Sequence, residues 1–183
     1  MENVHTKPKF SIICKMNVSD KMIDKICLLE TGKKFRSKLG PKELNGVYVS
    51  GDSSKVGKHK TYGYGLLVHP NGKFMDQVKN TYTQQEIESL YIQTVNKFGN
   101  KILHDISKPL KQCQLDALVC IKYNFGTVPS KLLQLVNQNP DNKDIYNVWI
   151  HLSDAQYKRL GNRVKGLLAR RKMEADWYFG NIS

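Results

Sequence analysis

A single carboxylate interrupts an apolar helical pattern near the start of the chain. Ile23, Ile26 and Cys27 recur at helical spacing, and the next position on the same face is Glu30. An apolar surrounding and the negative end of the helix dipole both disfavour the ionised form of a carboxyl group there. A carboxyl group that keeps its proton near neutral pH suits general-acid catalysis, such as protonation of the leaving oxygen of a glycoside. The alternative is that the helix ends one residue earlier and that Glu30 lies in solvent or pairs with a nearby lysine.

A second set of polar residues lies in the glycine-rich stretch that follows. Asp52 is placed on a turn, and Thr61 begins the segment Thr-Tyr-Gly-Tyr-Gly that ends at Gly65. A carboxylate and a hydroxyl on a small sheet could hold and deprotonate a water molecule across a cleft from Glu30. Glycines at positions 63 and 65 would leave room for a substrate to approach the backbone. The Asp-Ser-Ser sequence at position 52 is equally ordinary turn chemistry.

The elements that must position these residues indicate a mainly helical α+β domain with a small antiparallel β-sheet near the N-terminus. Recurring glycines and β-prone pieces between Gly40 and Gly72 predict the sheet and its turns, with an inserted loop over 38–45. Residues 1–18 are interpreted as an N-terminal extension and 19–183 as the catalytic domain. Helices are expected from a cap at Ser19 or Asp20 to Gly32, from a capping box at Thr83–Glu86 to about Gly99, over Leu115–Phe125, from Pro129 or Ser130 to before Pro140, over about 141–152, and over about 162–179.

Composition limits the classes of protein and of partner. The 183 residues suffice for one domain, and neither a membrane-spanning run nor a secretory signal peptide is recognisable. The four cysteines are expected to be reduced and structural, and no metal site is expected from the scattered histidines. A net charge of +13 indicates a polyanionic partner, which could be nucleic acid, a membrane surface or an anionic bacterial wall. The alternative is a solvated basic face without a specific partner.

Four segments, in chain order, resemble those of phage-type lysozymes, glycoside hydrolase family 24. Thr61-Tyr-Gly-Tyr-Gly65 resembles the family's Thr-Ile-Gly-Tyr-Gly segment, and Leu28-Leu-Glu-Thr-Gly32 is similar to the end of the helix that carries its catalytic glutamate. The segment from Gln112 to Gly126 resembles the family's Gln-x-Gln-x-Asp-Ala-Leu…Asn-x-Gly helix. The segment from Gly166 to Glu174 resembles its Gly-Leu-x-x-Arg-Arg-x-x-Glu helix. Together the four segments span nearly the whole chain beyond the extension.

The resemblance implies roles for the polar residues already singled out. Glu30 matches the general acid, and Thr61 matches the threonine that helps to hold the nucleophilic water. Asp52 is the best match for the acidic residue between them, although it precedes Thr61 by nine positions, a few more than in the family pattern. Glu43 is the other acidic residue in that interval. A second departure is Leu66, where a histidine commonly follows the Thr-x-Gly-Tyr-Gly segment.

Other residues have both a functional and a structural interpretation. The resemblance assigns Tyr64 and Asn124 to substrate binding, although Asn124 could instead be a polar cap near the end of a helix. The pair Arg170-Arg171 could bind the wall, but a solvated or structurally paired face is favoured. Trp149 could stack on sugars, but a core position is favoured.

The predicted activity is cleavage of the β-1,4 bond between N-acetylmuramic acid and N-acetylglucosamine in bacterial peptidoglycan, without a cofactor. The protein would act from the host cytoplasm after holin-dependent release, or from a virion in which phage tail or baseplate proteins are its partners. Nucleic-acid binding is ranked last, since no recognition helix stands out. The alternative function is that of a non-catalytic wall-binding or structural virion component with a lysozyme fold.

Overall fold

A computed structural model of the chain describes residues 16–48, 59–154 and 165–182. The helices are α1 (Asp20–Thr31), α2 (Pro41–Asn45), α3 (Met75–Val78), α4 (Gln84–Asp105), α5 (Gln112–Phe125), α6 (Ser130–Gln138), α7 (Asp144–Ile150) and α9 (Lys165–Tyr178). The strands are β1 (Val47–Tyr48) and β2 (Lys60–Thr61). The expected mainly helical α+β fold is therefore confirmed.

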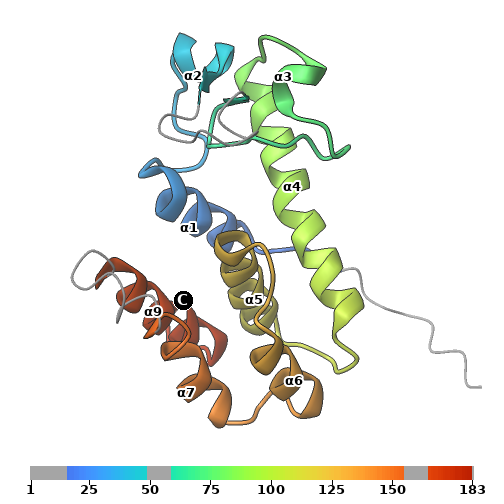
Figure 1. Cartoon of the computed structure of the whole chain (residues 1–183), viewed down its shortest axis with the longest axis vertical. Coiled ribbons are helices and arrows are strands. Elements are labelled where there is room, and N and C mark those ends of the chain that lie inside the picture. Colours follow the sequence, from blue (N-terminus) through green and yellow to red (C-terminus); the bar gives the residue numbers. More distant parts are fainter. Residues whose placement is uncertain (1–15, 49–58, 155–164, 183) are drawn as a thin grey trace, which may run out of the picture.

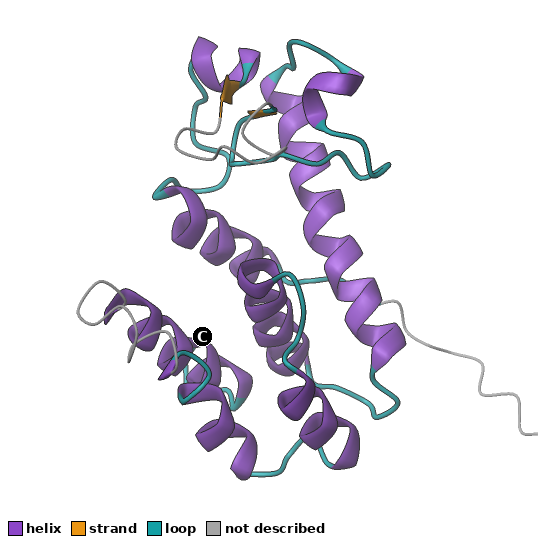
Figure 2. Ribbon diagram, viewed as in Figure 1, coloured by secondary structure: helices purple, strands orange, loops and turns teal. Residues whose placement is uncertain are grey.

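The long helix α4 joins two groups of elements (Figure 1). One group holds α2, α3 and the strands, and the other holds α5, α6, α7 and α9. Helix α1 lies between the groups and packs against α5. The strands are confined to the end of the molecule at which α2 and α3 lie (Figure 2). In this arrangement the C-terminal end of α1 lies next to the sheet region, as the sequence predicts for Glu30.

Helix α1 begins and ends at the expected residues. The Ser19 side chain accepts a hydrogen bond from the backbone N–H of Met22 at 3.2 Å, and Gly32 ends the helix with φ 71°. The serine cap is itself fixed to α5, since its N–H and its hydroxyl donate to the Asp116 carboxylate at 3.0 and 2.5 Å. The predicted apolar face of α1 is buried: Met22, Ile23, Ile26 and Cys27.

The small sheet has two antiparallel strands, in which Val47 pairs with Thr61 and Tyr48 with Lys60. The preceding stretch, expected as a loop over 38–45, instead contains the short helix α2. Pro41 is its first residue, and Glu43 accepts a hydrogen bond from the backbone N–H of Gly40 at 2.8 Å. A proline at the first helical position and a carboxylate two residues later are both favourable in a first helical turn, which explains the helix.

Helix α4 opens with the expected capping box and continues further than predicted. The Glu86 N–H donates to Thr83 Oγ1 at 3.2 Å, and the Thr83 N–H donates to Glu86 Oε2 at 2.8 Å. The helix passes through Gly99, where an end was expected, and runs to Asp105. A Cβ atom at position 99 would lie 3.0 Å from a methyl group of Val18, so the glycine allows close packing instead of ending the helix. Val18 therefore packs onto α4 although the sequence placed it in the extension.

The second group of elements contains the central apolar helix α5. Its residues from Gln114 to Ile121 are buried, and Gly126 ends it with φ 77°. Cys27, Cys113 and Cys120 are free thiols, and Cys14 lies outside the described residues. The described helices include none that is both long enough and apolar enough to cross a bilayer.

Candidate active site

Glu30 is the second-last residue of α1, and its carboxylate is paired with an arginine from the other end of the chain. Its Oε1 lies 2.7 Å from Nη2 of Arg170 on α9. The Glu30 side chain is 27% exposed, whereas that of Arg170 is 8% exposed. The interpretation in which α1 ends before Glu30 is excluded, because the helix runs through Thr31. The expected apolar surroundings were incomplete, since a buried guanidinium lies next to the carboxylate.

Two phenol groups also lie near Glu30, that of the buried Tyr91 and that of the half-buried Tyr123. Burial raises the pKa of Tyr123 on α5 to about 12, and the negative charge of Glu30 acts in the same direction. Burial likewise raises the pKa of Tyr91 on α4, with a smaller contribution from the same carboxylate. Both phenols are therefore uncharged near neutral pH. Within the described residues, the carboxylate pairs with Arg170, interacts with the more distant charge of Arg171, and lies near two neutral hydroxyl-bearing rings.

Thr61 lies on β2, where its side chain is half-buried. Its hydroxyl donates to the backbone carbonyl of Val47 on β1 at 3.2 Å. This bond fixes the orientation of the hydroxyl and leaves the oxygen lone pairs free to accept from a water molecule. Thr61 therefore has the chemistry that the predicted role requires.

The segment that follows Thr61 packs next to the end of α1. Gly65 has φ 85°, and a Cβ atom there would lie 3.5 Å from the methyl group of Thr31, the neighbour of Glu30. Gly63 has φ 53°, and a Cβ atom there would lie 2.2 Å from a methyl group of Ile87 on α4. From the sequence we expected the space at Gly63 to admit substrate, but a side chain of helix α4 occupies it.

Asp52 and Glu43 are the two candidates for the second carboxylate of the site, and the structure describes only Glu43. Asp52 lies outside the described residues. Glu43 is bound to the Lys33 ammonium and to the N–H of Gly40, and this ammonium holds the pKa of the Glu43 carboxyl below its usual range. These contacts give Glu43 a structural role in starting α2. Asp52 therefore stays the predicted partner of Glu30.

Comparison with known proteins decides the family. The phage lysozyme family model matches residues 42–174. The chain belongs to the phage lysozyme family. Among solved structures, seven chains match. One is the endolysin from Escherichia coli O157:H7 phage FAHEc1, at 25% identity and a TM-score of 0.56, over 91% of this chain and 96% of that one. No curated protein matches.

Membership of the phage lysozyme family makes this chain a lysozyme-type glycoside hydrolase. The family match contains Thr61 and Arg170 but begins after Glu30. The likeness to the phage FAHEc1 endolysin supports the family assignment over nearly the whole chain. The role of Glu30 therefore depends on its own position and contacts.

The two residues predicted to bind substrate lie in different surroundings in this phage lysozyme. The Tyr64 side chain is fully buried, its hydroxyl donates to the Ser37 carbonyl at 3.1 Å, and burial raises its pKa to about 12. It reaches no surface on which a glycan could lie, so its role in binding stays a prediction without structural support. Asn124 is exposed near the end of α5, and its side-chain oxygen accepts a hydrogen bond from Arg171.

Arg170 and Arg171 form ion pairs within the protein, which is one of the two structural interpretations that the sequence favoured. Unlike a solvated pair, they are buried. Arg171 is fully buried and Arg170 nearly so, and both contact the buried carboxylate of Glu174. Trp149 is fully buried, as expected. Sequence reasoning missed Glu174 as part of this site. The available signal was its spacing of three and four residues from the two arginines, which places all three on one helical face.

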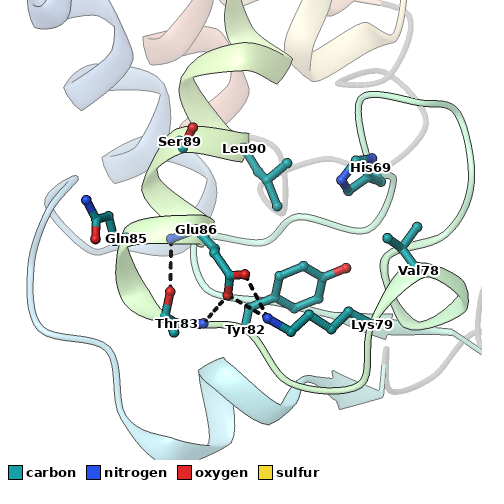
Figure 3. A pocket seen from close by; sticks show the side chains of 9 residues that line it. All are labelled: His69, Val78, Lys79, Tyr82, Thr83, Gln85, Glu86, Ser89 and Leu90. Carbon is teal, nitrogen blue, oxygen red and sulfur yellow. Dashed lines mark hydrogen bonds and ion pairs between the residues drawn. The ribbon is translucent and has the colours of Figure 1, made fainter.

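One cavity of the lysozyme lies apart from the candidate site. A cavity of about 540 Å³ lies at the start of α4 (Figure 3). Its lining includes Tyr82, Leu90 and the ion pair of Lys79 with Glu86 at 2.7 Å, but neither Glu30 nor Thr61. The described residues also contain no cluster of three or more His, Cys, Asp or Glu side chains that could hold a metal ion.

Proposed function

We propose that this phage lysozyme hydrolyses the β-1,4 bond between N-acetylmuramic acid and N-acetylglucosamine in bacterial peptidoglycan. The family match supports hydrolysis of this polymer. The observation that carries the proposal is the partly exposed carboxylate of Glu30, held by Arg170 at the end of α1 and adjacent to the segment that begins at Thr61.

In the proposed mechanism Glu30 protonates the glycosidic oxygen. Its ion pair with Arg170 is made through Oε1, which leaves Oε2 to carry the transferable proton. A water molecule attacks the anomeric carbon, oriented by the Thr61 oxygen and deprotonated by the carboxylate of Asp52. Two carboxyl groups with opposite protonation states suffice for this hydrolysis, and the mechanism needs no cofactor.

The decisive experiment measures the release of muropeptides from purified cell walls. We expect Glu30→Gln to lower the rate by several orders of magnitude, because the amide cannot donate the required proton. Asp52→Asn should lower it strongly, whereas Glu43→Gln should lower it only as far as it lowers stability. All variants need a circular dichroism spectrum like that of the wild type.

Three other results of the muropeptide assay would each change the proposal in a different way. Equal muropeptide release by Glu30→Gln and wild type would remove Glu30 from the mechanism. A loss of activity in Glu43→Gln but not in Asp52→Asn would move the second role to Glu43. Binding of the wild type to walls without any release would favour a non-catalytic virion component.

The route to the wall is part of the proposal. The protein acts after holin-dependent release from the host cytoplasm, or it is carried by the virion in contact with tail or baseplate proteins. Mass spectrometry of purified virions separates these routes, since a carried enzyme is present in a fixed number of copies per particle.

A further inference from the structure

The lysozyme contains a buried carboxylate that the proposed mechanism does not use. Glu174 on α9 is fully buried. Its Oε1 accepts hydrogen bonds from Arg170 Nε at 3.0 Å and from the Cys120 thiol at 3.4 Å. Its Oε2 accepts from Arg171 Nη1 at 2.7 Å and from the Trp149 indole N–H at 3.1 Å. Burial raises the pKa of the Cys120 thiol, which therefore stays a neutral donor.

One guanidinium connects this buried carboxylate to Glu30. Arg170 binds Glu174 through Nε and Glu30 through Nη2, at 3.0 and 2.7 Å. The guanidinium is planar and rigid, so two of its nitrogens held by separate carboxylates fix its position and its orientation. The position of the Glu30 carboxylate therefore depends, through Arg170, on Glu174, a buried residue of the site that forms no direct hydrogen bond or ion pair with Glu30 among the described residues.

A second guanidinium completes the neutralisation of the cluster. Arg171 binds Glu174 and also donates to Asn124, and its charge lies 4.7 Å from the centre of the Phe125 ring. The four charged groups therefore comprise two carboxylates and two guanidiniums. The cluster is closely but not completely bonded, because Nε of Arg171 is buried without a partner among the described residues.

Stability alone does not explain why such a cluster exists. Apolar side chains of similar volume often replace a buried ion cluster without loss of stability. Here the cluster joins α5, α7 and α9, and its outer end holds the Glu30 carboxylate of α1. We propose that Glu174 is a positioning residue, which acts through Arg170 to fix the carboxyl group of Glu30. The inference rests on the proposed function only in so far as Glu30 is the catalytic acid.

The first test follows the carboxyl carbon of Glu30 by NMR during a pH titration and needs no enzymatic activity. The described charged and titratable groups that interact with Glu30 are Arg170, the more distant guanidinium of Arg171, and the neutral phenols of Tyr91 and Tyr123. Removing the charge in Glu174→Gln leaves Arg170 with one carboxylate instead of two. We expect the Glu30 titration to move toward lower pH, and an unchanged titration would overturn the proposal.

The second test measures hydrolysis of a soluble glycan by the same variant. We expect kcat to fall by about tenfold to about a hundredfold with little change in KM, because a misplaced acid affects the chemical step more than binding. The pH-rate profile should move with the Glu30 titration. Glu174→Asp, which keeps the charge, should recover most of the titration but only part of kcat. A kcat and pH profile like those of the wild type in Glu174→Gln would overturn the proposal.

A matched control separates positioning from stability. Tyr146 on α7 donates to Asp176 on α9 at 3.0 Å, and among the described residues neither of them forms a hydrogen bond or an ion pair with Glu174, Arg170 or Arg171. Tyr146→Phe should lower the melting temperature while leaving the Glu30 titration and the pH-rate profile unchanged. If Tyr146→Phe moves both as far as Glu174→Gln does, general loosening of α9 explains the effect and the proposal fails.

A measurement on the wild type covers the case in which Glu174→Gln does not fold. The Arg170 Nε–H should give a resolved NMR signal that exchanges slowly with solvent, because it is buried and bonded to Glu174. Exchange as fast as that of a surface arginine would overturn the proposal. If walls remain uncut by the wild type while the NMR results hold, the proposed function fails and the link between Glu174 and Glu30 stands.

Discussion

At the scale of single residues, the clearest pH-sensitive group is the capping glutamate of α4. The ammonium of Lys79 and the Thr83 N–H lower the pKa of Glu86 from 4.5 to about 2. A carboxylate with a lowered folded-state pKa stabilises the protein above its unfolded pKa, and this contribution is lost as the pH falls toward 2. We therefore expect Glu86→Gln to melt at a lower temperature than the wild type at pH 7, with a difference that shrinks between about pH 4.5 and about pH 2. Melting curves over this range check it, and the difference should be smaller in a Lys79→Gln background.

Residues also differ in how far the sequence reveals their role. Glu30 was recognisable because helical spacing places it on the face of Ile23 and Cys27, a local property of the chain. Its partner Arg170 was not, since contact between residues 140 positions apart depends on how α1 and α9 pack. A basic pair is normally solvated, and only the buried Glu174 makes it a core feature.

At the scale of elements, the segment after Thr61 depends on one glycine that packs against α4. Gly63 has φ 53° and no space for a Cβ atom, because Ile87 would lie at 2.2 Å. We expect Gly63→Ala to destabilise the protein by about 2–4 kcal/mol, from the left-handed backbone together with overpacking. Gly72 is the control, since it has φ 91° with nothing near its Cβ position, and Gly72→Ala should cost only the backbone part. Urea unfolding gives both values, and equal losses would contradict the packing argument.

The elements themselves were largely predictable where local chemistry decides them. Ser19 and Gly32 bound α1, and Thr83 with Glu86 starts α4, as their side chains and backbone preferences require. The predicted end of α4 at about Gly99 was wrong, because this glycine has a packing role. It leaves space for Val18 that a side chain at position 99 would fill. Such a role depends on a neighbour from a distant part of the chain, which periodicity cannot show.

At the scale of the whole molecule, the net charge of +13 predicts how the enzyme meets its substrate. Attraction to an anionic wall weakens as salt screens it, with a Debye length of about 10 Å at 0.1 M. We expect the rate on purified walls to fall at least severalfold between low salt and about 0.5 M NaCl. The rate on a short neutral glycan should stay nearly constant. Equal salt dependence on the two substrates would show that salt acts on the active site instead of on wall attraction.

The attachment of α1 at its first turn restricts how the enzyme can admit a polymer. Ser19 is bonded to Asp116 of α5, and the N–H of Val18 donates to Asn96 of α4 at 2.9 Å. At 1.5 Å per residue, the twelve-residue helix extends about 18 Å from this double anchor to its other end, where Arg170 holds Glu30. Both ends of α1 are thus tied to other helices, the first turn to α4 and α5 and the last turn to α9, so Glu30 can move away from a sugar chain only by breaking its ion pair with Arg170. We therefore expect any widening that a sugar chain requires to come from the group that holds α2, α3 and the strands.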